Sequence, residues 1–190
     1  MNNPMVSNMV ISLGAMQVAR KIPFDDPQTL LYVRIAYVAT QVITLLVYYY
    51  TASKIRAKKD MTTLKFVEPA GPLTGEPDKV ITTTVRDYDL DQVSKLVRST
   101  YMAVLMMGFM HLYLKFTQPL FVQALMGLKS LYEAKPVQIH VFGKEPSGDL
   151  QRPFKAAAGM FGPTNDVKTD KASIEEAEKA AREAASKKDD

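Results

Sequence analysis

The chain has 190 residues, no cysteine and a formal net charge of +4. The missing cysteines exclude a disulfide scaffold, a thiolate metal site and thiol catalysis, and so small a charge does not by itself indicate nucleic acid. With 47% apolar residues and a mean hydropathy of −0.09, the averages resemble those of an ordinary soluble domain. These averages mislead, because most apolar residues lie in three regions.

The first apolar region, residues 4–19, is uncharged and 16 residues long. A cleaved signal peptide carries positive charge before its apolar run. Here Arg20 and Lys21 follow the run instead. The pattern therefore predicts a short membrane helix that stays in the protein.

The second apolar region, residues 30–50, contains one charged residue, Arg34. A helix of this length is about 30 Å long, enough to cross a bilayer core. Tyr48, Tyr49 and Tyr50 end the region where an interfacial aromatic belt would lie. The alternative, a buried helix of a soluble protein, fits less well because the region has no polar stripe.

The third apolar region consists of two runs, residues 100–114 and 119–128, each too short for a comfortable crossing. Asp89 is predicted to cap the helix that leads into this region, with Gln92 completing a variant of the capping box. Pro119 marks a kink or a new helix, since proline cannot donate to the helical ladder. The region therefore either crosses the membrane once or enters it and returns as a hairpin.

Four Lys and Arg residues between positions 54 and 59 form the strongest positive cluster beside any apolar region. Positive residues favour the cytosolic side of a membrane. We therefore predict that the segment that starts at residue 51 lies in the cytosol. The two positive residues after the first region then lie on the disfavoured side, so the rule is not satisfied throughout.

Three strand-like runs, residues 63–67, 80–87 and 137–142, alternate and are rich in β-branched residues, as strands are. A lone strand is unstable, and the three could form one sheet only if all lie on one side of the membrane. The strand pattern therefore favours the hairpin over the single crossing.

The C-terminal part of the chain is predicted to be a loop or linker over residues 143–170, which are rich in Gly, Pro and Lys. Residues 172–186 indicate a helix, because Ser173 and Glu176 form a capping box. Ile174 is its only large apolar residue, so we expect a solvated helix. A docking element for a large partner is the alternative.

Together these regions predict a helical integral membrane protein with three hydrophobic regions, a small cytosolic α+β element and a charged C-terminal helix. Its five parts are two membrane helices (1–50), a cytosolic segment with strands and an amphipathic lead-in helix (51–99), a third membrane region (100–134), a strand and loop (135–155), and a linker with the tail helix (156–190).

No enzyme motif is present, so we expect no catalytic residue, no cofactor and no metal site. His111 and His140 are the only histidines and lie far apart in the sequence. Polar residues inside the apolar helices are more informative, because they are costly in hydrocarbon and face a protein interior or a wet cavity. The residues predicted to line such a hydrophilic groove are Gln17, Arg34, Tyr37, Gln41, His111, Lys115 and Gln118.

Two observations qualify this groove. Arg34, Tyr37 and Gln41 share one helical face, which supports it. Arg34 and Lys115 lie near the ends of their apolar segments, however, and each could extend to the lipid headgroups instead.

Methionines are concentrated in the third region, where flexible thioether side chains suit varied apolar partners. We interpret them as an apolar slide for client helices, with simple helix packing as the alternative. The slide residues are Met102, Met106, Met107 and Met110.

Long motifs of unusual composition run from the first residues to the tail. They are MNNPMVSNMVISLGAMQVARKI (1–22), KKDMTTLKFVEP (58–69), TTVRDYDL (83–90), MGFMHLYLKFTQPLF (107–121), QIHVFGK (138–144), GDLQRPFK (148–155) and KTDKASIEEAE (168–178). In these stretches the chain resembles the fungal phosphate-metabolism membrane protein family. That family is also known as the third component of the SRP-independent (SND) targeting pathway.

The resemblance implies a multi-pass protein of the endoplasmic reticulum membrane. The partners it implies are the Sec translocon, the ribosome, nascent membrane proteins and other SND components, with no specific DNA. The older family name implies a role in phosphate uptake. This role can be understood as an indirect one, in which a phosphate permease fails to mature. A role in membrane insertion is also implied.

The residues suit an insertion factor. A groove would offer a polar flank hydrogen-bond partners part way across the bilayer. Two helices of about 16 residues span about 24 Å against a core of about 30 Å, so the bilayer would thin locally. The alternatives are an adaptor that links ribosome and translocon, and a phosphate transporter, although transporter repeats are not evident.

Overall fold

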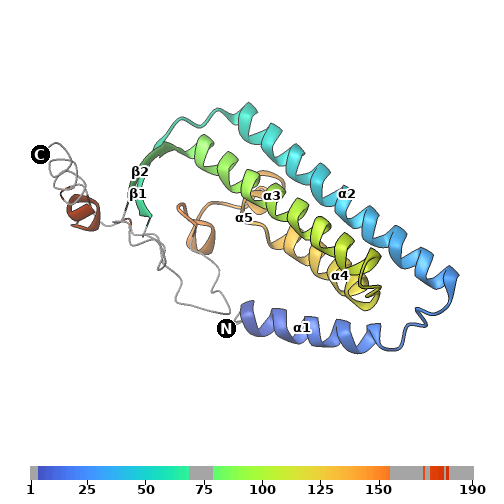
Figure 1. Ribbon diagram of the computed structural model, residues 1–190. Coiled ribbons are helices and arrows are strands. Elements are labelled where there is room, and N and C mark those ends of the chain that lie inside the picture. The colour runs from blue at the N-terminus through green and yellow to red at the C-terminus, as the bar shows by residue number, and fades with distance from the viewer. Residues whose placement is uncertain (1–3, 69–78, 155–168, 170–171, 178, 180–190) are drawn as a thin grey trace, which may run out of the picture. The chain divides into compact units, whose positions relative to one another are not determined.

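The computed structural model describes residues 4–68, 79–154, 169, 172–177 and 179 (Figure 1). The chain divides into a helical unit, residues 1–57 and 90–143, and a sheet unit, residues 58–89 and 144–190. The elements in chain order are α1 (Pro4–Ala19), α2 (Pro27–Lys58), β1 (Thr63–Glu68), β2 (Lys79–Thr84), α3 (Val85–Leu112), α4 (Gln118–Glu133), α5 (Lys135–His140) and a 3-10 turn (Gly148–Leu150).

Among the described residues, α2 is the one helix long and apolar enough to cross a membrane. It has 32 residues, or about 48 Å. Asp26 directly precedes this helix, and its carboxylate accepts hydrogen bonds from the amide (2.8 Å) and hydroxyl (2.7 Å) of Thr29. Only 17% of its most apolar window is buried, whereas the core helix of a soluble protein would be mostly buried.

The buried side of α2 is one stripe at helical spacing, and it includes three threonines. Thr40, Thr44 and Thr51 each donate the side-chain hydroxyl to the carbonyl four residues earlier, at 2.7–2.9 Å. Because each hydroxyl is satisfied within its own helix, it needs no hydrogen-bond partner on a neighbouring helix. The small threonine side chains can then pack closely against that helix.

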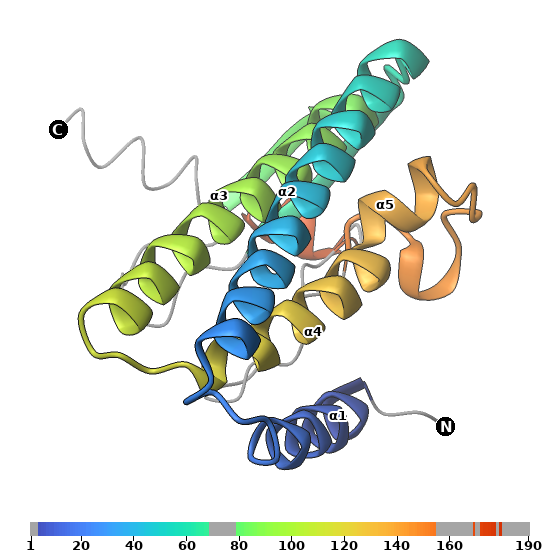
Figure 2. The same cartoon turned by 90° about the vertical axis from the view of Figure 1, so that its right-hand side faces the viewer.

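Helices α2, α3 and α4 lie side by side in alternating directions (Figures 1 and 2). In one core cluster, Tyr37 of α2 contacts residues that include Met107 of α3 and Leu120 of α4. At the other end, Ala52 of α2 shares a cluster with Val93 and Leu131. Thus α3 runs back along α2, the chain turns at residues 113–117, and α4 returns.

Helix α1 packs against α4 in the same unit (Figure 2). Ala15 and Ala19 are buried, and Asn8 accepts a hydrogen bond of 2.5 Å from the ammonium group of Lys129. The predicted helix over residues 4–19 is confirmed with the same bounds. Its small buried residues let the two helices approach closely.

The start of α3 differs from the prediction. Asp89 was expected at the N-terminus of this helix, but the helix begins at Val85, and Asp89 is buried inside it. Thr84 and Asp87 make the cap: the Asp87 amide donates to the Thr84 hydroxyl (3.1 Å), which donates to the Asp87 carboxylate (2.9 Å). A side-chain cap thus forms five residues earlier than predicted, directly after β2.

The sheet has two antiparallel strands, β1 and β2, with Thr63 opposite Thr84 and Glu68 opposite Lys79. The strand predicted at residues 63–67 is confirmed, whereas the one predicted at 80–87 ends at Thr84.

The third predicted strand, residues 137–142, is wrong, because this segment begins in α5. Pro136 lies in the first turn of α5, a position where proline favours a helix start. Val137 and Ile139 are buried from this short helix. The three-stranded sheet that favoured a hairpin therefore does not form, although α3 and α4 do form a helical hairpin.

The tail prediction lies partly outside the described residues. Residues 172–177 are helical, as predicted for the start of the tail helix. The linker at 156–167 and all of 180–190 fall outside the described part of the chain.

Candidate functional site

A pocket of about 360 Å³ lies among α2, α3 and α4, and we call it the Arg34 pocket. Two of the residues that line it, Val38 and Leu112, are 57% and 69% exposed, so the pocket opens to the outer surface of the helices. Its lining residues are Arg34, Tyr37, Val38, Val104, Met107, Gly108, His111, Leu112 and Leu120.

Arg34 is held in this pocket by a buried histidine. The guanidinium Nε donates to His111 Nε2 at 2.9 Å. Because an arginine nitrogen only donates, Nε2 must be the acceptor and the ring proton must lie on Nδ1. His111 Nδ1 lies 3.0 Å from the carbonyl oxygen of Phe116, which accepts that proton. His111 is therefore neutral here, and it anchors Arg34 to the turn between α3 and α4.

No carboxylate forms an ion pair with Arg34 within the described residues, so its positive charge is available to the pocket. Tyr37 adds a second polar group: it is 6% exposed, and its hydroxyl has no hydrogen-bond partner in the described part of the chain. Buried polar atoms are nearly always paired. The pocket thus combines an uncompensated cation with an unpaired hydroxyl in an otherwise apolar lining.

The other predicted groove residues lie elsewhere. Gln41 is half-buried at the contact of α2 with α4, where its Nε2 would be 3.9 Å from a Cβ built on Gly127. Lys115 is exposed in the turn, with φ of 61°, while Gln118 begins α4 and Gln17 is exposed on α1. Of the seven predicted residues, Arg34, Tyr37 and His111 line this pocket together, whereas the other four do not.

The predicted methionine slide does not form one continuous surface. Met107 is buried and lines the Arg34 pocket, whereas Met102 and Met106 are both 60% exposed. Met110 is half-buried. The exposed pair belongs to the outer surface of α3.

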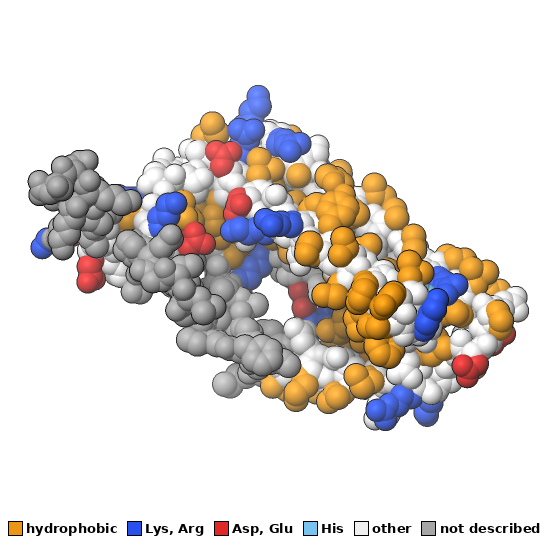
Figure 3. Space-filling model, viewed as in Figure 1, with side chains coloured by type: hydrophobic (Ala, Val, Ile, Leu, Met, Phe, Trp, Pro, Cys, Tyr) orange, Lys and Arg blue, Asp and Glu red, His pale blue; other side chains and the backbone are white. Residues whose placement is uncertain are grey.

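Large apolar side chains cover the outer surfaces of α1, α2 and α3, as Figure 3 shows for the face that α2 and α3 present. Leu46 of α2, Leu105 of α3 and Val10 of α1 are each 60% exposed or more. Soluble monomers rarely expose so extended an apolar surface. This surface and the length of α2 fit an association with a membrane.

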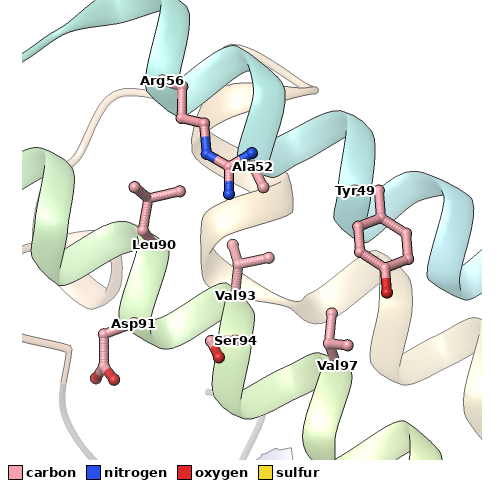
Figure 4. Close-up of a pocket in the computed structure, with 8 residues that line it drawn as sticks. All are labelled: Tyr49, Ala52, Arg56, Leu90, Asp91, Val93, Ser94 and Val97. Atoms are coloured by element: carbon pink, nitrogen blue, oxygen red, sulfur yellow. The ribbon is translucent and has the colours of Figure 1, made fainter.

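A second pocket was missed by the sequence analysis. It measures about 510 Å³, lies between the C-terminal part of α2 and the first turns of α3 in the helical unit, and includes Arg56 and Asp91 (Figure 4). The sequence did indicate an amphipathic helix at residues 90–101. It did not indicate which surface of α2 this helix contacts.

The Pho88 family model, described as "Phosphate transport (Pho88)", matches residues 1–185. The chain belongs to the Pho88 family. This confirms the family resemblance that the motifs indicate.

Two relatives of this Pho88 chain carry informative names. It is 49% identical over 180 residues to SRP-independent targeting protein 3 of Saccharomyces cerevisiae, covering 94% of this chain and 95% of the relative. It is 38% identical over 178 residues to the SRP-independent targeting protein 3 homolog of Schizosaccharomyces pombe, covering 93% and 92%. No solved structure matches the chain.

Proposed function

We propose that this Pho88-family protein takes part in SRP-independent targeting of membrane proteins at the endoplasmic reticulum. In this proposal it acts as an insertion factor, and the Arg34 pocket receives the polar flank of a client protein. The observation that carries the proposal is the Arg34–His111 pair, in which a buried histidine holds an exposed arginine in a pocket among exposed apolar helices. The names of the two relatives support the targeting role.

The pocket suits this task because it lowers the cost of a polar group in a lipid setting. An unpaired polar group in hydrocarbon costs several kcal/mol. The Arg34 guanidinium and the Tyr37 hydroxyl would offer hydrogen bonds during the crossing. Because arginine only donates, the pocket favours acceptors, namely carboxylates and carbonyl oxygens.

Helix lengths support a locally thin bilayer. Helices α1 and α4 have 16 residues each and measure about 24 Å, against a hydrocarbon core of about 30 Å. Lipids around short helices thin to match them. A thinner bilayer would shorten the path of the client flank.

The orientation that we propose follows from one core cluster. This cluster includes Ile55 near the end of α2, Val93 in α3 and Ala134 after α4. The C-terminal end of α2, the N-terminal part of α3 and the C-terminal end of α4 therefore lie at the same end of the helical unit. The positive residues at 54–59 lie at that end, which we assign to the cytosol. The Sec translocon, the ribosome and other SND components are the partners that we propose for this end. In this orientation the Arg34 pocket lies in the half of the bilayer farther from the cytosol, and it receives the client flank there.

Insertion into microsomes tests this proposal. A client with an acidic flank is translated with microsomes that carry either the wild-type protein or Arg34→Gln, at equal expression. We expect the variant to lower insertion about tenfold, since a charge-assisted hydrogen bond contributes about 1.5–3 kcal/mol. The matched control is Lys115→Gln, which removes one positive charge outside the pocket. Equal loss in both variants would contradict the proposal.

An adaptor function is the main alternative, favoured by the charged helix that begins at residue 172. Deletion of residues 165–190 separates the two functions. If ribosome association disappears while insertion persists, the tail acts as the adaptor. If insertion fails together with association, the tail is part of the insertion machinery.

Phosphate transport is a second alternative, because the family model bears that description and Arg34 is a cation in a pocket without a carboxylate partner among the described residues. Saturable phosphate flux in liposomes that contain this protein alone would support transport. The insertion proposal expects no flux above that of empty liposomes.

A further inference from the structure

The second pocket, of about 510 Å³, lies between α2 and α3, and we call it the Arg56 pocket (Figure 4). Its two charged residues, Arg56 and Asp91, lie at one end together with Leu90, and Tyr49 and Val97 lie at the other (Figure 4). Val93 and Ser94 lie between them. The charge of the pocket is thus confined to one end.

The position of this pocket along α2 corresponds to a membrane interface. Tyr49 belongs to the three consecutive tyrosines that follow the most apolar part of α2, and Arg56 belongs to the positive cluster beyond them. Aromatic side chains and cations occur at headgroup level in this order. The hydroxyls of Tyr49 and Tyr101 lie 3.1 Å apart and connect α2 to α3 beside the apolar end of the pocket.

The charges in the pocket are available to a ligand. Arg56 makes no ion pair among the described residues. Asp91 pairs with Lys95 at 2.8 Å, but these side chains are 55% and 61% exposed, and such surface pairs exchange readily. Arg56 and Asp91 therefore line the same cavity without being paired to each other, although the Asp91 carboxylate is turned away from Arg56 (Figure 4).

Apolar surface continues from the pocket toward the middle of the helices. Leu46 and Val42 precede Tyr49 by one and two turns on α2 and are 62% and 50% exposed. On α3, Leu105 follows Tyr101 by one turn and is 69% exposed. These stripes have room for acyl chains.

We propose that the Arg56 pocket binds the headgroup of a zwitterionic phospholipid. Arg56 takes the phosphate, for which a planar guanidinium is well suited, while Asp91 takes the ammonium group and the acyl chains lie along the two apolar stripes. A lipid fits better than a soluble anion, because the cavity also holds a carboxylate and opens onto apolar surface. This site is separate from the Arg34 pocket and requires only that α2 lies in a membrane.

Native mass spectrometry of the full-length protein tests the assignment. The protein is extracted from vesicles of phosphatidylethanolamine, phosphatidylcholine and phosphatidylglycerol in equal amounts, and the retained lipid is identified. We expect one tightly retained lipid, enriched in the two zwitterionic species. Arg56→Gln should lower its occupancy about tenfold, and Asp91→Asn should abolish the preference for zwitterionic lipid while lipid is still bound.

Lys54→Gln is the matched control, because Lys54 belongs to the same positive cluster but lies outside the pocket, above the ring of Tyr50. It should change occupancy less than twofold. Equal loss in Lys54→Gln and Arg56→Gln would overturn the proposal, and so would displacement of the lipid by excess inorganic phosphate. A photoreactive group at Ser94 gives an independent measurement on a protein with intact Arg56. Crosslinks to photoreactive phosphatidylethanolamine support the site, whereas crosslinks to client peptide alone contradict it.

Discussion

Arg152 and Asp89 form a two-pronged ion pair inside the sheet unit. Arg152 Nε donates to Asp89 Oδ1 at 2.7 Å, and Nη2 donates to Oδ2 at 2.6 Å. The Asp89 side chain is fully buried, and that of Arg152 is 10% exposed. Two further contacts support the pair: the amide of Phe154 donates to the Tyr88 hydroxyl at 2.7 Å, and their rings pack together. The GDLQRPFK motif is thus fixed to the first turns of α3.

Removing one partner of this ion pair should destabilise the sheet unit strongly. Arg152→Met removes both of these charged hydrogen bonds from the buried Asp89 carboxylate, which costs about 3–5 kcal/mol. Arg152→Lys should lie between wild type and Arg152→Met, since lysine cannot make two parallel hydrogen bonds. Pulse proteolysis of the full chain over a denaturant series measures the change. The control is Lys95→Gln, which breaks an exposed pair worth less than about 1 kcal/mol.

The loop before β1 should weaken in acid. Asp60 accepts hydrogen bonds from the hydroxyl (2.7 Å) and amide (3.1 Å) of Thr62, and these lower the pKa of the Asp60 carboxyl. A lowered folded-state pKa contributes stability above the unfolded value of about 3.9, and the contribution is lost as pH falls through the folded value. Hydrogen exchange of the Thr62 amide, corrected for its intrinsic rate, should show this loss below about pH 4. The acid-dependent step should be absent from Asp60→Asn.

The contact of α2 with α4 should tolerate only a small residue at Gly127. A Cβ built there lies 3.6 Å from Thr40 Cγ2, so alanine fits, but a longer side chain meets α2. Gly127→Leu should cost about 1–3 kcal/mol through overpacking, whereas Gly127→Ala should be neutral or stabilising because alanine favours helix. Thermal unfolding in detergent micelles measures both variants. Gly14→Leu is the control, since nothing lies within 4 Å of that site; a similar loss there would dismiss the packing argument.

The histidine beside Arg34 should matter through the hydrogen bond that it accepts. His111→Leu removes the acceptor of Arg34 Nε and the donor to Phe116, so the guanidinium loses its fixed position. We expect insertion of an acidic flank to fall about fivefold or more, in line with one lost charge-assisted hydrogen bond. His111→Asn retains polar groups and should recover part of the activity. Unchanged insertion in His111→Leu would mean that Arg34 works without its anchor.

Local signals predicted much of the helical unit. The bounds of α1 and the presence of α2 follow from long runs that are mainly apolar and nearly free of charge, and the break near Pro119 follows from the chemistry of proline. The segment at 137–142 was predicted wrongly, because two apolar residues in alternation suit a strand and one face of a short helix equally well. Pro136 in the first turn decides for the helix.

The sites were less predictable, because their partners are far apart in the chain. Arg34 and His111 were each identified as costly polar residues in apolar segments, but their hydrogen bond spans 77 positions. Lys115 was predicted to line the same groove as His111, but α3 ends at Leu112, so Lys115 lies in the following turn and does not share the helix of His111. The Asp89 carboxylate was interpreted as a cap, since no local signal indicates a partner 63 positions away.

Site-specific photocrosslinking to an arrested nascent membrane protein tests the central claim most directly. The probe is placed at Leu112, an exposed residue that lines the Arg34 pocket, or at Met106, an equally accessible residue of α3 outside it. The account predicts crosslinks from Leu112 to the polar flank of the client, lost when Arg34→Gln is added. Crosslinks from Met106 alone, or crosslinks from Leu112 that do not depend on Arg34, would contradict it.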